Sequence, residues 1–320
     1  MRAAVLHKLG ETPKFEDFPD PAPGKDEVLI RVKAVALENV DKAMASGSHF
    51  ASRQFLSQLP AIVGFDGVGA LEDGTLVGFG GVKAPYGTMA EKTVVPNGYT
   101  VPIPEGVDAV TAAALPASAL TSLFPLKWGA KLQPGETVLV NGATGVSGKL
   151  AVQIAKLLGA GRIVGTGRNA DSMKQIQEFG AEAVIDLKQS DEKLAEAFKK
   201  EAREGYDIIL DFLWGHPTEV LIKTLIPSEI KMSKPVRLIQ IGEKAGTIIS
   251  LSADSLRTSG LTISGAAGIT PETIGEGTKL VWDLFKANQL HMDIEQVPLK
   301  DIESAWQRTD FQGKRIVIVP

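Results

Sequence analysis

One segment near the middle of the chain restricts the possible fold more than any other. Residues 137–148 read TVLVNGATGVSG, an apolar strand-like run, a turn of small residues and then the start of an amphipathic stretch. Ala143, Gly145 and Gly148 occupy the three positions of the G-x-G-x-x-G pattern, with alanine replacing the first glycine. In a strand–turn–helix unit, such residues let backbone approach a pyrophosphate and let helix and strand pack closely. The residues predicted to contact a dinucleotide here are Ala143, Thr144, Gly145, Val146, Ser147 and Gly148.

The chain around and after this turn alternates between strand-like and helix-like stretches. The apolar runs lie at 137–140, 162–166, 183–186, 207–212, 236–241 and 261–264. Amphipathic stretches of helical length separate the early runs, and this alternation predicts a parallel sheet covered by helices on both faces. Six strands are the number in a complete doubly wound, Rossmann-type dinucleotide domain. The fold class is therefore α/β, and Phe212, Ile241 and Gly242 are further predicted cofactor contacts.

The first part of the chain has a different texture, with short strand-like runs separated by proline and glycine. Residues 27–35 alternate apolar and charged side chains, which is typical of a half-buried strand. Further strands are predicted at 3–6, 75–79 and 91–95. This part is predicted to form a mainly antiparallel β domain.

The end of the second parallel strand indicates which nicotinamide dinucleotide is bound. An NAD-binding protein usually has an acidic residue there for the ribose hydroxyls. This chain has GTGRN at 165–169, and no carboxylate occurs before Asp171. Arg168 offers a planar cation that suits a 2′-phosphate, although it can also be a solvated surface arginine. NADPH is therefore the predicted cofactor, with Asn169 adding a hydrogen bond.

Composition excludes several other classes of function. The chain has no cysteine, and its four histidines are scattered, so no metal site is expected. The formal net charge of -4 provides no broad basic field for nucleic acid. No uninterrupted apolar run near the length of a membrane span is evident, and the N-terminus does not resemble a signal peptide. We expect a cytoplasmic protein that does not bind membranes.

The whole chain resembles the medium-chain dehydrogenase/reductase superfamily, in its zinc-free NADPH:quinone oxidoreductase branch. The resemblance rests on PGKDEVLIRVKAVALENVDKAMASG, AIVGFDGVGALEDG, VPIPEGVDAVTAAALPASALTS, LQPGETVLVNGATGVSG and GKRIVIVP. It implies a GroES-like catalytic domain formed by residues 1–118 and 269–320, around a dinucleotide-binding Rossmann domain at 119–268. It also implies a homodimer, or a pair of dimers, joined partly through the strand at 261–264. The implied reaction is hydride transfer from NADPH to a quinone or a similar conjugated carbonyl compound.

Two departures from related branches bear on the chemistry. Glu38 and Phe65 stand where the zinc-dependent branch has a cysteine and a histidine ligand, and the cysteine-rich structural zinc loop is absent. The resemblance therefore implies a zinc-independent enzyme. The usual asparagine of the quinone reductases also aligns with Glu38, and their nearby tyrosines align with Ala43 and His49.

Candidate catalytic residues follow from this comparison. A proton donor or substrate contact is predicted among Glu38, Lys42, His49 and Tyr86. Glu38 can instead form a salt bridge, His49 can be a surface residue, and Tyr86 can anchor a loop. Thr121 is expected near the nicotinamide amide or, alternatively, as a helix-capping hydroxyl.

The same hydride geometry also suits an enone, enal or enoyl thioester acceptor. A different class of function, a nucleotide-binding regulatory protein with little turnover, stays open because the tyrosines are absent.

Overall fold

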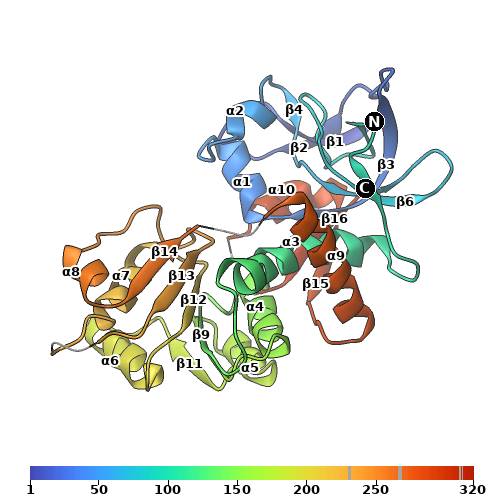
Figure 1. Cartoon of the computed structure of the whole chain (residues 1–320). Helices are drawn as coiled ribbons and strands as arrows, with labels where there is room; N and C mark the ends of the chain where they lie inside the picture. The colour runs from blue at the N-terminus through green and yellow to red at the C-terminus, as the bar shows by residue number, and fades with distance from the viewer. Residues whose placement is uncertain (230–231, 266–268, 310, 312) are drawn as a thin grey trace. The chain divides into compact units, whose positions relative to one another are not determined.

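The computed structural model describes all residues except 230–231, 266–268, 310 and 312. Its contacts divide the chain into two compact units (Figure 1). Unit 1 comprises Met1–Pro116 and Asp293–Pro320, and unit 2 comprises Ala117–Met292.

Unit 2 is built on a six-stranded parallel sheet with the order β11-β10-β9-β12-β13-β14. The strands are β9 (Thr137–Asn141), β10 (Arg162–Gly167), β11 (Ala183–Asp186), β12 (Ile208–Asp211), β13 (Val236–Gln240) and β14 (Leu261–Ser264). The order in which strands are added reverses at β9. This first strand of the unit lies in the middle of the sheet, between β10 and β12. This arrangement confirms the predicted doubly wound sheet, and the six predicted strands differ from the observed ones only at their ends.

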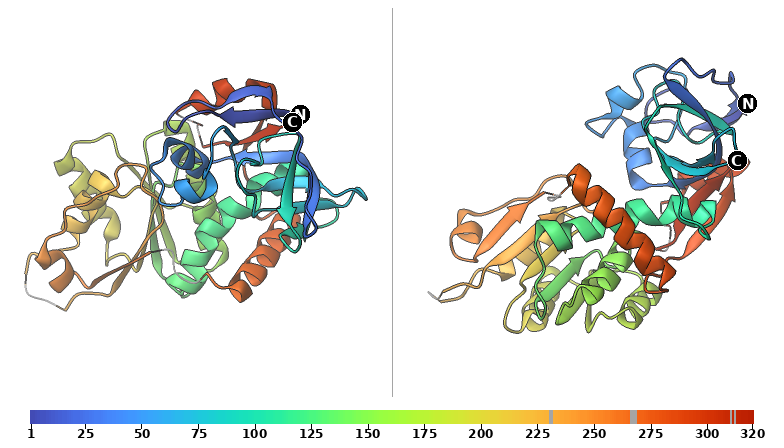
Figure 2. Two further views of the ribbon diagram at one scale, coloured as in Figure 1. Left: turned by 90° about the horizontal axis from the view of Figure 1, so that it is seen from above. Right: turned by 45° about the vertical axis from the view of Figure 1, so that its right-hand side comes forward.

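Helices cover both faces of this sheet, as Figure 2 shows. They are α4 (Val146–Leu157), α5 (Ala170–Glu178), α6 (Asp191–Ala202), α7 (Gly215–Thr224), α8 (Ala253–Arg257) and α9 (Pro271–Lys286). Leu139 and Ile209 of the strands share one buried core with Phe198 of α6 and Leu221 of α7. Because the strands are buried on both faces, they are continuous apolar runs, which made them visible in the sequence.

Unit 1 contains two mainly antiparallel sheets. The smaller sheet joins β2 (Lys14–Asp17), β1 (Arg2–Leu6) and β4 (Ala61–Ile62). The larger sheet contains β3 (Glu27–Leu37), β5 (Gly67–Ala70), β6 (Leu76–Phe79), β7 (Lys92–Pro96), β8 (Thr100–Pro102), β15 (Ile294–Pro298) and β16 (Arg315–Val319). Only the pair β15–β16 within it is parallel. Three short helices complete the unit, α1 (Asn39–Ser46), α2 (Ser52–Phe55) and α10 (Ile302–Gln307), with a 3₁₀ turn at Leu299–Asp301.

The C-terminal tail, Asp293–Pro320, is part of unit 1. The resemblance implied that the end of the chain returns to this domain. β16 pairs antiparallel with β3, with Ile316 opposite Leu37 and Ile318 opposite Val35. This register places Arg315 next to the end of β3, close to where α1 begins. The last residues of the chain therefore help to build the site around Glu38.

The later domain boundary differs from the predicted one. The predicted limit at residue 268 falls outside the described residues, and α9 belongs to unit 2 instead of the catalytic domain. α9 belongs to unit 2 because it packs on α3 (Ala109–Phe124) and on the π-helical turn Pro125–Gly129. A Cβ on Gly277 would lie 3.0 Å from Leu120 and 3.1 Å from Phe124, so α9 approaches α3 closely at this point.

The segment Ala109–Gly129 also corrects the expectation that no stretch has the length of a membrane span. By length and composition alone, this one helical segment among the described residues is apolar enough to cross a membrane. More than half of it is buried within the fold. Such burial is typical of a core helix, which has the same composition.

Candidate cofactor site and active site

The glycine turn connects β9 to α4. Gly142 has φ of +96°, a left-handed conformation that favours glycine. Gly145 is the N-cap of α4, and no side chain caps the helix. A Cβ on Gly145 would have one neighbour, the Gly142 oxygen at 3.8 Å, so space is open beside the turn. The N–H groups of the first helical turn and the positive end of the helix dipole thus form a cradle that fits a diphosphate.

Close packing explains the other small residues of the motif. A Cβ on Gly148 would lie 2.2 Å from the Gly142 oxygen and 2.7 Å from the Ala143 Cα. Ala143 is fully buried, and a Cβ on Gly165 would lie 3.0 Å from its Cβ. α4 therefore lies directly on the turn, at a distance that only glycine at position 148 allows.

A buried hydrogen-bond network supports the turn from below. The Asn141 Nδ2 donates to Asp211 Oδ1 at 3.0 Å and to Thr218 Oγ1 at 3.2 Å. The Thr166 hydroxyl donates to Asn141 Oδ1 at 2.9 Å and accepts from the Gly142 N–H at 2.8 Å. These bonds join the carboxyl ends of β9, β10 and β12, so the turn is fixed to three strands at once. This network was not predicted from the sequence, although a polar residue at the end of two apolar strands was a visible signal.

Asp211 also fixes the loop that follows β12. Its Oδ1 accepts from the N–H groups of Leu213 at 3.0 Å and Trp214 at 3.1 Å, which holds Trp214 at a φ of +53°. Its Oδ2 accepts from the Thr218 hydroxyl at 2.7 Å. Burial raises the pKa of Asp211, while the hydrogen bond from Thr218 opposes that rise. The carboxyl group is thus an organising centre for the edge of the sheet where ligands of such folds bind.

Three of the predicted cofactor residues meet at this edge. The N–H groups of Ile241 and Gly242 both donate to the Asp211 backbone oxygen, at 2.8 and 3.1 Å. A Cβ on Gly242 would lie 2.6 Å from the Phe212 oxygen, so the two loops are in contact. Beside them lies a hollow of about 380 Å³ lined by Trp214, Gln240, Glu243, Thr247, Ile263, Ser264 and Gly265.

The end of β10 presents the predicted phosphate-binding residues. Arg168 follows the last residue of the strand and is exposed to solvent. Within the described part of the chain, no ion pair engages its guanidinium group. Asn169 is the N-cap of α5, and its side-chain oxygen accepts from the Ser172 N–H at 2.9 Å. Asn169 therefore has a structural role that leaves its side-chain amide as the group able to donate to a ligand.

Thr121 lies on α3 one residue before a contact with α4. Its hydroxyl donates to the Ala117 oxygen at 2.6 Å, within its own helix. The neighbouring Ser122 hydroxyl donates to the Ser147 oxygen at 2.9 Å, in the first turn of α4. The two helices thus meet at the predicted phosphate cradle, and the Thr121 hydroxyl keeps its capacity to accept a hydrogen bond.

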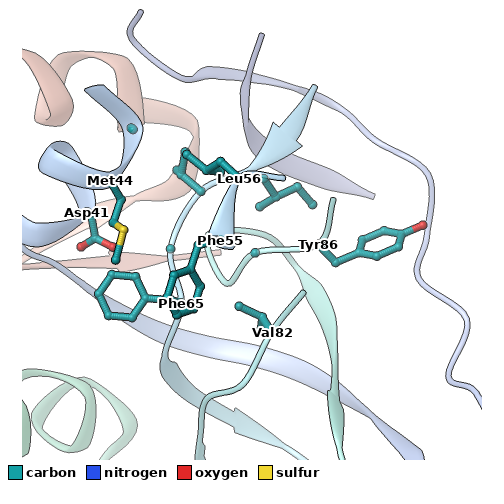
Figure 3. A pocket seen from close by; sticks show the side chains of 12 residues that line it. Asp41, Met44, Phe55, Leu56, Phe65, Val82 and Tyr86 are labelled. Carbon is teal, nitrogen blue, oxygen red and sulfur yellow. The ribbon is translucent and has the colours of Figure 1, made fainter. Parts of the chain in front are cut away.

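Unit 1 has a small cavity with an aromatic wall. Figure 3 shows the carboxylate of Asp41 beside Met44 and Phe65, and Phe55, Leu56, Val82 and Tyr86 are the other labelled lining residues. The rings of Phe55 and Phe65 are 5.8 Å apart between centroids. The free volume of about 20 Å³ has room for a water molecule. Phe50, by contrast, is 93% exposed.

Three carboxyl groups and one guanidinium group gather where β3 meets α1. Glu38 pairs with Arg315, with 3.0 Å between Oε1 and Nη2. Asp41 accepts a hydrogen bond from the Glu38 N–H at 2.7 Å. Burial, with a contribution from Glu38, raises the pKa of Asp41 well above its usual range and the pKa of Asp66 to about 7. Sequence reasoning found Glu38 but missed its partner, because β16 brings Arg315 across 277 positions of sequence only when the sheet forms.

The other predicted catalytic residues have local partners. The Lys42 Nζ donates to the Arg308 oxygen at 2.6 Å and lies 4.6 Å from the centre of the Phe311 ring. The His49 Nδ1 accepts from the Ala51 N–H at 3.2 Å. Tyr86 contributes to the cavity lining, but Figure 3 shows its hydroxyl pointing away from the aromatic wall. The structure therefore does not bring Glu38, Lys42, His49 and Tyr86 together around one point.

These features define a dinucleotide-binding protein of the dehydrogenase class. Residues 147–282 match the family described as "Zinc-binding dehydrogenase". The chain is 31% identical over 240 residues to an alcohol dehydrogenase of Schizosaccharomyces pombe, covering 63% of this chain and 67% of that protein. The chain belongs to the medium-chain dehydrogenase/reductase superfamily, in its NADPH:quinone oxidoreductase-like branch.

Relatives of similar length carry more specific names. A "Probable NADPH-dependent quinone reductase" of Emericella nidulans is 25% identical, with 96% of each chain covered. An acryloyl-coenzyme A reductase of Sulfurisphaera tokodaii is 27% identical over 91% of this chain and 99% of that protein. The quinone oxidoreductase of Thermus thermophilus, also solved in complex with NADPH, is 26% identical with a TM-score of 0.76 over the full length of both chains.

The zinc ligands implied by the family description are not evident in this chain. It has no cysteine, and Glu38 in the position of the first ligand is paired with Arg315. Among the described residues, no group of three or more histidine, cysteine, aspartate or glutamate side chains has the arrangement of a metal site. The residues present therefore do not fit a zinc ion at this place.

Proposed function

We propose that the protein is a zinc-independent reductase that transfers hydride from NADPH to a quinone or a similar conjugated carbonyl acceptor. The observation that carries the proposal is the open glycine turn, with Gly145 exposing the start of α4 and Gly148 in contact with the turn. The quinone reductase names of two full-length relatives support the choice of acceptor.

The proposed cofactor contacts follow the edge of the parallel sheet. The backbone of residues 143–148 binds the diphosphate, and Arg168 with the Asn169 amide binds the 2′-phosphate. Phe212, Ile241 and Gly242 line the continuation of the site toward the nicotinamide, and Thr121 contacts its amide. The bound cofactor supplies the hydride, and the chain orients the reactants and excludes water from them.

The proposed reaction asks for no metal. Quinones and enones accept hydride without a Lewis acid when a donor stabilises the oxygen that becomes negative. The arrangement around Glu38 agrees with a metal-free site, because Glu38 is paired with Arg315.

A second acceptor class is favoured by one finding. The acryloyl-coenzyme A reductase relative covers nearly the whole chain, and its name describes the reduction of an activated double bond. The same hydride geometry serves an enoyl thioester, an enone and a quinone, so the two readings differ only in the acceptor.

The proposal is tested by the loss of NADPH absorbance with a panel containing a naphthoquinone, a short enone and an enoyl thioester. Turnover fastest with the naphthoquinone supports the quinone reading, and fastest turnover with the enone or thioester supports the second. Saturable NADPH binding without turnover of any acceptor contradicts both and points to a nucleotide-binding protein of little activity. A cytoplasmic homodimer joined partly through β14 completes the proposal, and sedimentation equilibrium tests the dimer.

A further inference from the structure

The hollow of about 380 Å³ in unit 2 lies where three neighbouring parallel strands end. Asp211 of β12 is level with Gln240 of β13 in the register of the sheet. Ile239 of β13 is in turn level with Ser264 of β14. The ends of these strands and the loops that follow them supply the lining, so the whole hollow belongs to unit 2. Its size is that of a small-molecule site.

Trp214 lines this hollow in a backbone conformation that side chains rarely adopt. Its φ is +53° and its ψ is -166°, close to a region that is essentially restricted to glycine. The Trp214 N–H donates to Asp211 Oδ1 at 3.1 Å, which holds the residue in this conformation. Strained residues of this kind cluster at sites that bind ligands, so the position of Trp214 beside an open hollow indicates a role in binding.

The loop that carries Trp214 is bonded to the loop after β13. The Ala245 N–H donates to the Leu213 oxygen at 2.8 Å. A Cβ on Gly215 would lie 2.7 Å from the Ala245 oxygen, so the two loops are also in contact on the other side of Trp214. Trp214 and Glu243 therefore line the same hollow from two loops that support each other.

The topology of the sheet leads the nicotinamide half of the cofactor to this hollow. A dinucleotide crosses a doubly wound sheet where the strand order reverses, with one mononucleotide half on either side. Arg168, proposed for the 2′-phosphate, follows β10, so the other half extends over β12, β13 and β14. Phe212, proposed above as a cofactor contact, is two residues before Trp214. Gly242, another such contact, directly precedes Glu243.

We propose that this hollow receives the nicotinamide ring and favours its oxidised, positively charged form, through the indole of Trp214 and the carboxylate of Glu243. The proposal rests on the proposed reductase function. Hydride transfer takes the electron pair of the ring C–H bond to the acceptor, and the ring is left with a positive charge. An aromatic face, that of tryptophan most strongly, attracts a cation, and a carboxylate attracts it by its charge. Both groups therefore bind the ring more tightly after the transfer than before it, which makes the bound cofactor a stronger hydride donor.

The charges around the hollow agree with this preference. Among the lining residues that the structure describes, Glu243 has the only charged side chain. Its carboxylate forms no ion pair with another residue in the described part of the chain. Lys244, its neighbour in the chain, is exposed to solvent and is not part of the lining. The lining therefore presents a net negative charge to a bound ring.

The test is a pair of equilibrium titrations of the full-length protein, one with NADPH and one with NADP⁺, at low salt. Low salt is used because Glu243 is exposed, and added ions would screen its charge. In Trp214→Leu and in Glu243→Gln, the ratio of the NADP⁺ Kd to the NADPH Kd is expected to rise roughly threefold or more. Trp214→Phe keeps an aromatic face and should change the ratio less than Trp214→Leu does.

Two controls locate the effect at the ring. Glu178→Gln removes the same charge from the exposed last residue of α5, at the edge of the sheet where the strands begin, and should leave the ratio unchanged. The ligand 2′-phospho-ADP-ribose lacks the nicotinamide, so its Kd should be the same in wild type and in every variant. Because Glu243 is exposed, Glu243→Gln keeps the proposal testable even where Trp214→Leu destabilises the fold.

The outcomes separate this proposal from the reductase function. A wild-type ratio in both Trp214→Leu and Glu243→Gln overturns the proposal, whether the two affinities fall equally or neither changes. When the wild-type protein also oxidises NADPH with an acceptor, that result overturns the proposal alone. A wild-type protein that binds neither NADPH nor NADP⁺ overturns the reductase function and this proposal together.

Discussion

The two glycines of the turn are expected to fail in different ways when each is replaced by alanine. Gly148→Ala places a Cβ 2.2 Å from the Gly142 oxygen. The atoms must separate by more than ~1 Å to reach ordinary contact, and overpacking of this kind costs about 1–3 kcal/mol. For a protein of this size, each kcal/mol lowers Tm by roughly 2–4 °C. Gly148→Ala should therefore lose both stability and NADPH affinity.

Gly145→Ala provides the matched comparison. Its φ of -78° and ψ of 170° suit alanine, and the new Cβ would be 3.8 Å from its nearest neighbour. The Tm of this variant should equal or slightly exceed that of wild type. The methyl group stands where the diphosphate must approach the backbone, so the Kd for NADPH should rise at least about tenfold, or ~1.4 kcal/mol.

Thermal unfolding without nucleotide and a fluorescence titration with NADPH measure the two effects separately. Equal losses of Tm in both variants would contradict the packing argument. Wild-type NADPH affinity in Gly145→Ala would show that the diphosphate does not bind at this turn.

Three further predictions concern other parts of the protein. Arg168→Ala should weaken NADPH binding roughly tenfold or more in a binding titration and leave the affinity for NADH nearly unchanged. Equal losses of affinity for the two nucleotides would refute a 2′-phosphate contact. Burial raises the pKa of Asp66 from 3.8 to about 7, so the folded protein holds a proton that the unfolded chain releases between these values. Asp66 should therefore contribute a fall in the free energy of unfolding as pH rises through this window, by at most ~1.4 kcal/mol per pH unit, and urea unfolding of Asp66→Asn should show a shallower fall that lacks this contribution. Dialysis against a strong chelator should leave NADPH oxidation unchanged, whereas loss of activity that zinc restores would contradict a zinc-independent mechanism.

The sequence predicted unit 2 well because its signals are local. Parallel strands buried on both faces are continuous apolar runs, and the small residues of the turn are adjacent in the chain. Unit 1 was harder to predict, because β2, β4 and β8 are only two to four residues long and β5 is the glycine-rich GVGA. Short strands of this kind acquire their conformation from pairing with neighbours, which no local pattern reports.

The residues of the candidate site were predictable from the sequence only where they lie at the ends of apolar strands. The turn, Arg168 and the sheet-edge residues follow from strand ends, which the sequence locates closely. The Glu38–Arg315 pair and the cavity position of Asp41 depend on how β3, β16 and α1 meet. The β3–β16 contact joins residues far apart in the chain, so the burial of the Asp41 carboxyl group had no sequence signal beyond its place in a capping position.

The most direct test of the account is a fluorescence titration of the wild-type protein with NADPH and, in parallel, with NADH. We expect a saturable change with NADPH at lower concentration than with NADH, because the open turn binds the diphosphate and Arg168 binds the additional phosphate. The absence of a saturable change with either nucleotide would contradict the central claim that this turn is a dinucleotide site.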